Sequence, residues 1–235
     1  MKGDLEALQG RIGYGFRDTG LLERALTHPS WLQDNPGAAG NNQRLEFLGD
    51  SVLQLILTEA LFGLFPEDRE GELTKRRAIL GKGAFLSALA REVGLDAGLR
   101  LGANEEATGG RSRDAALEDA FEALVGAVSL DGGVESARRV VLGIYGDIPG
   151  RLRALETHAN PKGRLQEIVQ PEHGNRALRY EVLGTEGADH ERTYEVAVYL
   201  HDARMGSGRG PSKKVAEEEA ARAALAALDR GTTGG

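Results

Sequence analysis

The 235-residue chain contains no cysteine, which excludes a disulfide framework and a thiolate metal site. Aromatic residues make up only 5% of it, and no stretch provides the 18 or more uncharged apolar residues of a membrane span. Its first ten residues include acidic side chains and lack the apolar run of a signal peptide. These absences favour a cytoplasmic protein with no membrane partner.

The chain also lacks an excess of positive charge, since 29 Lys and Arg face 36 Asp and Glu and the net charge is −7. Residues 1–159 hold 18 basic and 24 acidic side chains, and residues 160–230 hold 11 and 12. Neither part is basic, which excludes nucleic-acid binding through a diffuse positive field. Contacts with phosphates must come from locally placed Lys and Arg side chains, or through metal ions held by the acidic part.

Hydrophobic spacing predicts that roughly the first 150 residues are helical. Apolar residues recur at every third or fourth position over residues 45–56, 85–93 and 117–128. Residues 103–113 are polar and contain glycine, which predicts a loop between helices. A further helix is expected over about 133–157.

The pattern changes after Pro161, which is expected to start a short helix that stops before Pro171. Residues 179–183 and 192–200 alternate and are rich in β-branched and aromatic side chains, as in strands. A loop at 206–214 then leads into an alanine-rich helix. The order of elements is therefore α-β-β-(β)-α.

The predicted fold is an all-α domain over residues 1–155, a linker at 156–160, and a small α+β domain of order α-β-β-β-α over 161–230. Residues 231–235 are expected to be a disordered tail.

Two pairs of carboxylates interrupt apolar helical faces. Glu46 and Asp50 are four residues apart in NNQRLEFLGDSVL, and Asp119 and Glu122 are three apart in AALEDAFEALVGA. Each spacing puts its pair on one face of a helix, where the like charges repel and give the helix no stability. If the two helices pack face to face, the four oxygen ligands suit Mg²⁺ or Mn²⁺, which can activate water for phosphodiester hydrolysis. The alternative is four ordinary surface acids, and spacing alone identifies no substrate.

The segment NNQRLEFLGDSVL closely resembles the signature motif of ribonuclease III catalytic domains. LLERALTHPSW, FPEDREGELTKRRA and LGANEEATGGRSRDAALEDAFEALVGAVSLDGG resemble the other blocks of that family, in the family's order. PKGRLQEIVQ, ADHERTYEVAV and GRGPSKKVAEEEAARAAL resemble a double-stranded RNA-binding domain over 160–229. The resemblance covers nearly the whole chain, and it implies a metal-dependent endoribonuclease that cleaves duplex RNA.

Carried over position by position, the resemblance implies that Glu46, Asp50, Asp119 and Glu122 form the metal-binding cluster. Asp50 and Glu122 are the implied catalytic pair, and Glu70 matches an accessory acidic position. The implied cofactor is Mg²⁺, with Mn²⁺ as a substitute, and no further small-molecule cofactor is expected.

The chain departs from the family pattern at Gln43, where many members carry glutamate. An amide donates and accepts hydrogen bonds but adds no negative charge, so the metal-placing or RNA-contacting role of that glutamate is in doubt here. His28 is interpreted as a structural histidine in preference to a general base. Four basic side chains are as consistent with solvated surface as with phosphate contacts: Arg44, Lys75, Arg76 and Arg77.

The predicted RNA-binding residues follow from the shape of duplex RNA, which displays 2′-hydroxyls across a shallow minor groove. Gln166 on the first helix can hydrogen-bond there, and His190 in the turn between strands is the candidate for the next groove. Lys213 and Lys214 stand at the start of the last helix, whose dipole also favours phosphate. The acidic run at 217–219 is interpreted as solvent-facing charge that stabilises the first turn.

The resemblance also implies a homodimer whose two active sites lie along one cleft and each cut one strand. Its products would carry 5′-phosphates and short 3′ overhangs, and its targets would be ribosomal RNA precursors and some messenger RNAs. One alternative is a non-catalytic regulator that binds duplex RNA; Gln43 hints at it, but the four intact carboxylates argue against it. Another is a metal-dependent phosphohydrolase of small nucleotides, which would leave the RNA-binding domain without a purpose.

Overall fold

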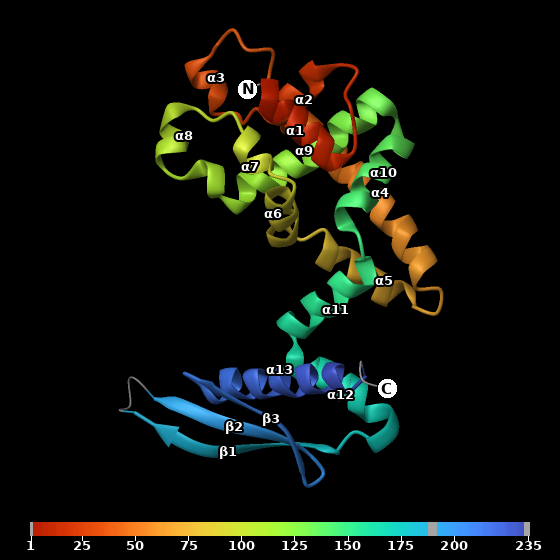
Figure 1. Cartoon of the computed structure of the whole chain (residues 1–235), viewed down its shortest axis with the longest axis vertical. Coiled ribbons are helices and arrows are strands. Elements are labelled where there is room, and N and C mark those ends of the chain that lie inside the picture. The colour runs from red at the N-terminus through yellow and green to blue at the C-terminus, as the bar shows by residue number, and fades with distance from the viewer. Residues whose placement is uncertain (1, 188–191, 233–235) are drawn as a thin grey trace. The chain divides into compact units, whose positions relative to one another are not determined.

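The computed structural model describes residues 2–187 and 192–232, and the chain forms two compact units, Met1–Pro149 and Gly150–Gly235 (Figure 1). The first unit is helical apart from one isolated bridge between Thr27 and Arg100, and the second contains a three-stranded sheet. The predicted fold class is confirmed. His190, a predicted RNA-binding residue, lies outside the described residues.

Ten α-helices and a short 3₁₀-helix lie within the described part of the first unit. They are α1 (Lys2–Ile12), α2 (Thr19–Ala25), α3 (Trp31–Asp34), α4 (Gln43–Leu64), α5 (Glu70–Leu80), α6 (Gly83–Glu92), α7 (Leu95–Gly98), α8 (Ala103–Ala107), η1 (Gly110–Ser112), α9 (Asp114–Gly132) and α10 (Val134–Tyr145). Helix α11 (Ile148–Ala159) follows and includes the residues predicted to be a linker.

Helices α4 and α9 pack against each other at the centre of this unit. Their backbones come unusually close, because a Cβ built at Gly49 would lie 1.7 Å from the carbonyl oxygen of Glu122. A Cβ at Gly126 would likewise lie 2.2 Å from the carbonyl oxygen of Leu45. Glycine at both positions is therefore what allows the two helices to cross at this distance.

By length and composition alone, α4 could cross a membrane. Its apolar composition has another explanation here, since it is a core helix whose buried side chains pack inside the helical unit. The buried residues are Leu45, Gly49, Val52, Leu53, Ile56, Leu57 and Leu61.

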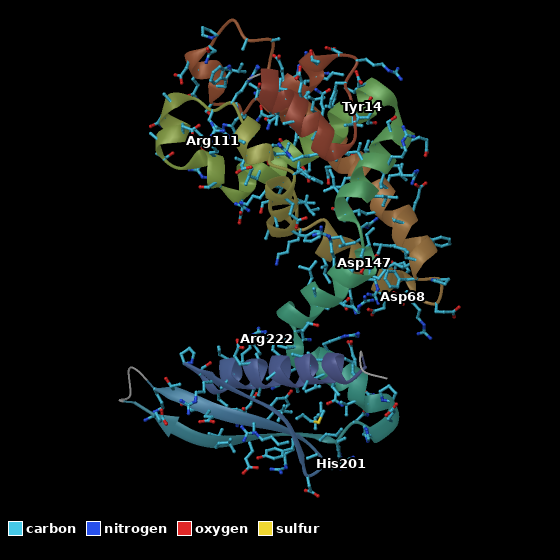
Figure 2. All side chains as sticks on the ribbon, viewed as in Figure 1. Tyr14, Asp68, Arg111, Asp147, His201 and Arg222 are labelled. Carbon is cyan, nitrogen blue, oxygen red and sulfur yellow. The ribbon has the colours of Figure 1, made fainter. Side chains whose placement is uncertain are left out.

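Two predictions for the first unit were wrong. The single helix expected over 133–157 is broken into α10 and α11, and Gly146 at the break has a φ of 59° that ordinary residues rarely adopt. The expected loop at 103–113 contains α8 and η1. Arg111 (Figure 2) connects this segment to α7, because its guanidinium pairs with Glu106 and donates to the carbonyl oxygens of Asp96 (2.7 Å) and Leu99 (2.9 Å).

The second unit packs two helices against an antiparallel sheet of order β1-β2-β3. Its elements are α12 (Pro161–His173), β1 (Leu178–Glu186), β2 (Thr193–Leu200), β3 (Ala203–Gly210) and α13 (Lys213–Thr232). In register, Leu178 faces Leu200 and Tyr194 faces Gly210. Inward side chains of α12, β2 and α13 form the core, among them Leu165, Val169, Val196, Val198, Ala220 and Ala224.

Two boundaries in the second unit also differ from those predicted. Helix α12 continues past Pro171 to His173 and ends at Gly174, whose φ is 81°. Residues 206–210 belong to strand β3 although a loop was expected. The glycines there make room for α13, because a Cβ at Gly206 would lie 2.6 Å from the carbonyl oxygen of Ala220 and one at Gly208 would lie 2.4 Å from its nitrogen.

Candidate active site

The crossing of α4 and α9 gathers the four predicted carboxylates. Gly49 lies between Glu46 and Asp50 in sequence, and its backbone contacts the backbone of Glu122 directly. Asp119 lies three residues before Glu122 on the same face of α9. The two pairs therefore lie where α4 and α9 cross, and glycine permits this crossing because it has no side chain to separate the helices.

Burial and neighbouring carboxylates raise the pKa of two of the four side chains, Glu122 and Glu46. Burial and neighbouring negative charges raise the pKa of Glu122 from 4.5 to about 8. After burial, the causes in order of size are Asp50, Glu118, Glu46 and Asp119. Burial also raises the pKa of Glu46, with Asp119 as the next cause. The site therefore carries negative charge in excess, which a cation would relieve.

Glu118 is a fifth carboxylate of this site that was not predicted. It lies four residues before Glu122, and burial followed by the charge of Asp119 raises its pKa. Its carboxylate packs over the first residue of α6, since a Cβ at Gly83 would lie 2.1 Å from its Oε2. The signal was available in the sequence, because Glu118 and Glu122 have the same four-residue spacing as Glu46 and Asp50.

The donor set suits a hard divalent cation in its chemistry. All four predicted ligands offer carboxylate oxygens, and none of them pairs with Lys or Arg within the part of the chain that the structure describes. Their positions are not those of an assembled metal site, since no group of three or more Asp, Glu or His side chains among the described residues is arranged to hold an ion. Asp50 instead accepts a hydrogen bond from Nε2 of Gln54 (3.3 Å).

Glu70 lines a cavity to which none of the four predicted ligands contributes. Glu70 is the first residue of α5 and accepts a hydrogen bond from Oγ1 of Thr74 (3.2 Å). It lines a cavity of about 480 Å³ together with Thr58, Phe62 and Arg77 from the later parts of α4 and α5. The accessory role of Glu70 stays a prediction.

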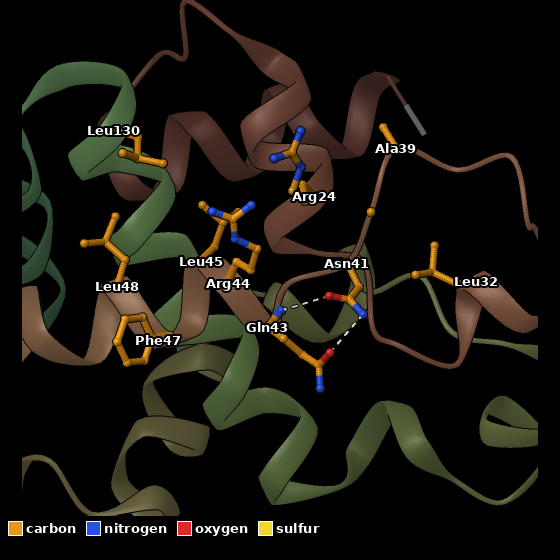
Figure 3. Close-up of a pocket in the computed structure, with 11 residues that line it drawn as sticks. Arg24, Leu32, Ala39, Asn41, Gln43, Arg44, Leu45, Phe47, Leu48 and Leu130 are labelled. Atoms are coloured by element: carbon orange, nitrogen blue, oxygen red, sulfur yellow. Dashed lines mark hydrogen bonds between the residues drawn. The ribbon is translucent and has the colours of Figure 1, made fainter.

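Gln43 is exposed at the start of α4 and bonded locally. Its Oε1 accepts a hydrogen bond from Nδ2 of Asn41 (3.1 Å), and its backbone nitrogen donates to Oδ1 of Asn41 (3.2 Å) (Figure 3). The Gln43 amide therefore stabilises the turn that leads into α4. This local role requires no negative charge at position 43.

His28 also makes local contacts. Its Nδ1 accepts a hydrogen bond from the backbone nitrogen of Ser30 (3.2 Å) and lies 2.8 Å from Oγ of Ser30. That hydroxyl in turn accepts from the backbone nitrogen of Gly102 (2.9 Å). The ring therefore joins two loops, as expected of a structural histidine. Burial raises the pKa of Asp119, and the charge of His28 opposes that rise in part.

An exposed apolar surface adjoins the start of α4. The Phe47 side chain is 80% exposed and borders a cavity of about 730 Å³ (Figure 3). Leu32, Leu48 and Leu130 line the same cavity, and Leu130 is also exposed. Aromatic and aliphatic groups gathered and exposed in this way are typical of a surface that another protein covers.

The predicted RNA-binding residues lie on two helices of the second unit. Gln166 on α12 is partly exposed, and its side-chain nitrogen donates to the carbonyl oxygen of Asn175 (3.4 Å). Lys213 and Lys214 are exposed first-turn residues of α13. The prediction that the acidic run faces solvent was wrong for Glu217, whose side chain is only 14% exposed and pairs with Lys162.

Comparison with known proteins identifies both units. A family model described as Ribonuclease-III-like matches residues 18–147, and the model of the double-stranded RNA binding motif matches residues 161–228. The chain is 43% identical to Ribonuclease 3 of Nitratidesulfovibrio vulgaris over 227 residues, which are 96% of this chain and 89% of that protein. It is 44% identical to Ribonuclease 3 of Pseudomonas aeruginosa over 232 residues, with 97% of each chain covered.

A solved structure shares the fold of the first unit. The nuclease domain of ribonuclease III from Campylobacter jejuni aligns with a TM-score of 0.57 at 38% identity, covering 62% of this chain and 99% of that one. That structure is described as flexible in a region involved in dimer formation. A crystal structure of the same domain aligns with a TM-score of 0.56 and 39% identity.

Proposed function

The chain belongs to the ribonuclease III family and is an endoribonuclease that cleaves double-stranded RNA, and we propose that Glu46, Asp50, Asp119 and Glu122 perform the cleavage with Mg²⁺. The observation that carries this assignment is the close crossing of α4 and α9, which collects these acids without any basic partner in the described chain. Mn²⁺, another hard cation that oxygen ligands accept, would substitute for Mg²⁺.

The chain's own residues prepare the site in two ways. The four carboxylates would hold the cation, which when bound supplies positive charge to the phosphate and lowers the pKa of water. Burial and the neighbouring carboxylates raise the pKa of Glu122 to about 8, and a bound cation would lower that pKa and favour the ionised form that acts as a ligand. Asp50 is its strongest charged neighbour, so these two are the pair proposed to face the reacting atoms.

The active enzyme is proposed to be a homodimer in which each site cuts one strand. The exposed Phe47 beside a cavity is the support on this chain, because an uncovered aromatic side chain of this kind is stabilised by burial in an interface. The related Campylobacter jejuni domain has a region involved in dimer formation. Products with 5′-phosphates and short 3′ overhangs, and cytoplasmic maturation of ribosomal and messenger RNA precursors, belong to the same proposal.

The proposal is tested by digesting a long perfect RNA duplex and its single strands with the purified chain. We expect cleavage of the duplex only, with Mg²⁺ or Mn²⁺ and not with EDTA, and end mapping should give 5′-phosphates and staggered cuts. Equal cleavage of single strands, or undiminished cleavage in EDTA, would contradict the proposal.

Mixed dimers test whether each of the two active sites cuts one strand. Wild-type and Glu122→Gln subunits with different tags are co-expressed, and the mixed species is isolated and used in excess over duplex with a competitor trap. We expect one strand to be cut and the other to remain whole, so that denaturing gels show cut strands while native gels show intact duplex. Complete cleavage of both strands in a single turnover would refute one strand per site.

A further inference from the structure

A partly buried polar cluster joins three elements of the RNA-binding unit. Nζ of Lys162, at the start of α12, lies 2.5 Å from Oε2 of Glu217 on α13. The same Nζ lies 4.7 Å from the centre of the Tyr180 ring on β1. Oε1 of Glu217 is also 3.9 Å from Nζ of Lys213. Figure 1 shows α12 and α13 side by side along one face of the sheet.

Burial of its carboxylate distinguishes the Lys162–Glu217 pair from the Arg164–Glu167 pair on α12. The Glu217 side chain is 14% exposed, whereas Glu167, which pairs with Arg164 on α12, is 68% exposed. The Tyr180 hydroxyl is buried without a hydrogen-bond partner among the described residues, and burial followed by the charge of Glu217 raises the pKa of Tyr180 to about 12. The Lys162 side chain is itself 38% exposed, so the Glu217 carboxylate is the buried partner of the pair. Exposed pairs contribute little, but loss of Lys162 would leave this largely buried carboxylate without its closest cation.

The cluster lies between the two helices that are expected to touch RNA. Gln166 follows Lys162 by four residues on α12, and Lys214 is adjacent to Lys213 on α13. A domain of this type recognises duplex RNA by shape, contacting successive minor grooves and the phosphates between them. The distance between α12 and the start of α13 must therefore match the groove spacing of an A-form RNA duplex and not that of a B-form DNA duplex.

We propose that the Lys162–Glu217 pair fixes α12 relative to the first turn of α13 and thereby sets the preference of this domain for RNA duplexes over DNA duplexes. Lys162 and Glu217 are positioning residues in this proposal, since they act through Gln166 and Lys214. Glu217 also engages Lys213, so Lys214 carries more of the phosphate contact than Lys213 does. The inference rests on the proposed recognition of duplex RNA by this domain.

The test compares the affinity of the full chain for an RNA and a DNA duplex of the same sequence, about 20 base pairs long, by fluorescence anisotropy in EDTA. We expect Glu217→Gln and Lys162→Met each to lower the RNA-to-DNA affinity ratio, by roughly three- to tenfold. The two substitutions change the net charge in opposite directions. Electrostatics alone would therefore strengthen binding of both duplexes in the first variant and weaken it in the second, with the ratio unchanged.

Three controls make the outcome decisive. Glu218→Gln removes the same charge at the next position and should leave the ratio unchanged, and Lys162→Arg keeps the pair and should also preserve it. Thermal melting establishes that each variant is folded at the assay temperature. If Glu217→Gln is not folded, Glu217→Asp, which keeps the charge but shortens its reach, takes its place.

An unchanged ratio in Glu217→Gln and Lys162→Met would overturn the proposal, as would an equal fall in Glu218→Gln. A wild-type chain that does not distinguish RNA from DNA duplexes would instead refute the proposed duplex-RNA recognition, so the two failures are distinguishable.

Discussion

Replacing Glu122 by glutamine should make the metal-free nuclease unit more stable at alkaline pH. Glu122 has a pKa of about 8 in the folded chain and an ordinary value of 4.5 when unfolded. The folded state therefore retains a proton that the unfolded state has lost, so the free energy of unfolding falls as pH rises from about 4.5 to about 8. Glutamine keeps the size of the side chain and removes this titration.

The magnitude follows from the interval between the two pKa values. Each pH unit within it corresponds to about 1.4 kcal/mol, but Glu122 is only half-buried and solvent screens part of the repulsion. After that discount we expect the free energy of unfolding of Glu122→Gln to be about 2 kcal/mol higher than that of the wild type at pH 8. Near pH 4.5 the two free energies should be equal. Added Mg²⁺ should reduce the difference, because the cation neutralises the same charges.

Urea unfolding followed by tryptophan fluorescence measures this directly, since the only tryptophan is Trp31 in the nuclease unit. Glu67→Gln, at an exposed position, is the matched control and should show no such pH dependence. The reasoning is refuted if the wild type and Glu122→Gln differ in stability by the same amount at pH 5 and pH 8 in EDTA.

Three further substitutions test other parts of the site. Gln43→Glu should change the rate of duplex cleavage by less than roughly tenfold, which corresponds to about 1.4 kcal/mol of activation free energy. The reason is that Gln43 is bonded to Asn41 and not to the four acids. A gain of several hundredfold would mean that the natural chain lacks most of the activity its site could have. Gly49→Ala should destabilise the nuclease unit by about 3 kcal/mol or more in urea unfolding, because its methyl group would overlap the Glu122 carbonyl; wild-type stability would contradict the crossing geometry. Glu118→Gln should weaken binding of Mn²⁺ roughly three- to tenfold by calorimetry while leaving duplex binding in EDTA unchanged, and an unaltered Mn²⁺ affinity would remove Glu118 from the site.

Local spacing predicted the parts of the site that depend on one helix at a time. The i, i+4 and i, i+3 spacings selected Glu46, Asp50, Asp119 and Glu122 as candidates, because a helix turns by a fixed angle per residue whatever it packs against. The mutual approach of α4 and α9 could not be predicted in this way. It depends on Gly49 and Gly126 lying opposite each other, which is a property of the packed pair.

The errors have the same physical origin. Glycines at 206–210 indicated a loop, yet they make room for α13 over strand β3. Glu217 belongs to an acidic run that indicated solvent exposure, yet its side chain is largely buried and pairs with Lys162, which is 55 residues away in sequence. In both cases a contact distant in sequence overrides a local preference.

The central claim is that the four-carboxylate cluster cleaves duplex RNA with a divalent cation. It is tested most directly by single-turnover cleavage of one RNA duplex by wild type and Glu122→Gln in Mg²⁺, with duplex affinity measured in parallel in EDTA. The account predicts equal affinity and a cleavage rate that falls by orders of magnitude in the variant. Cleavage by Glu122→Gln at the wild-type rate would contradict it.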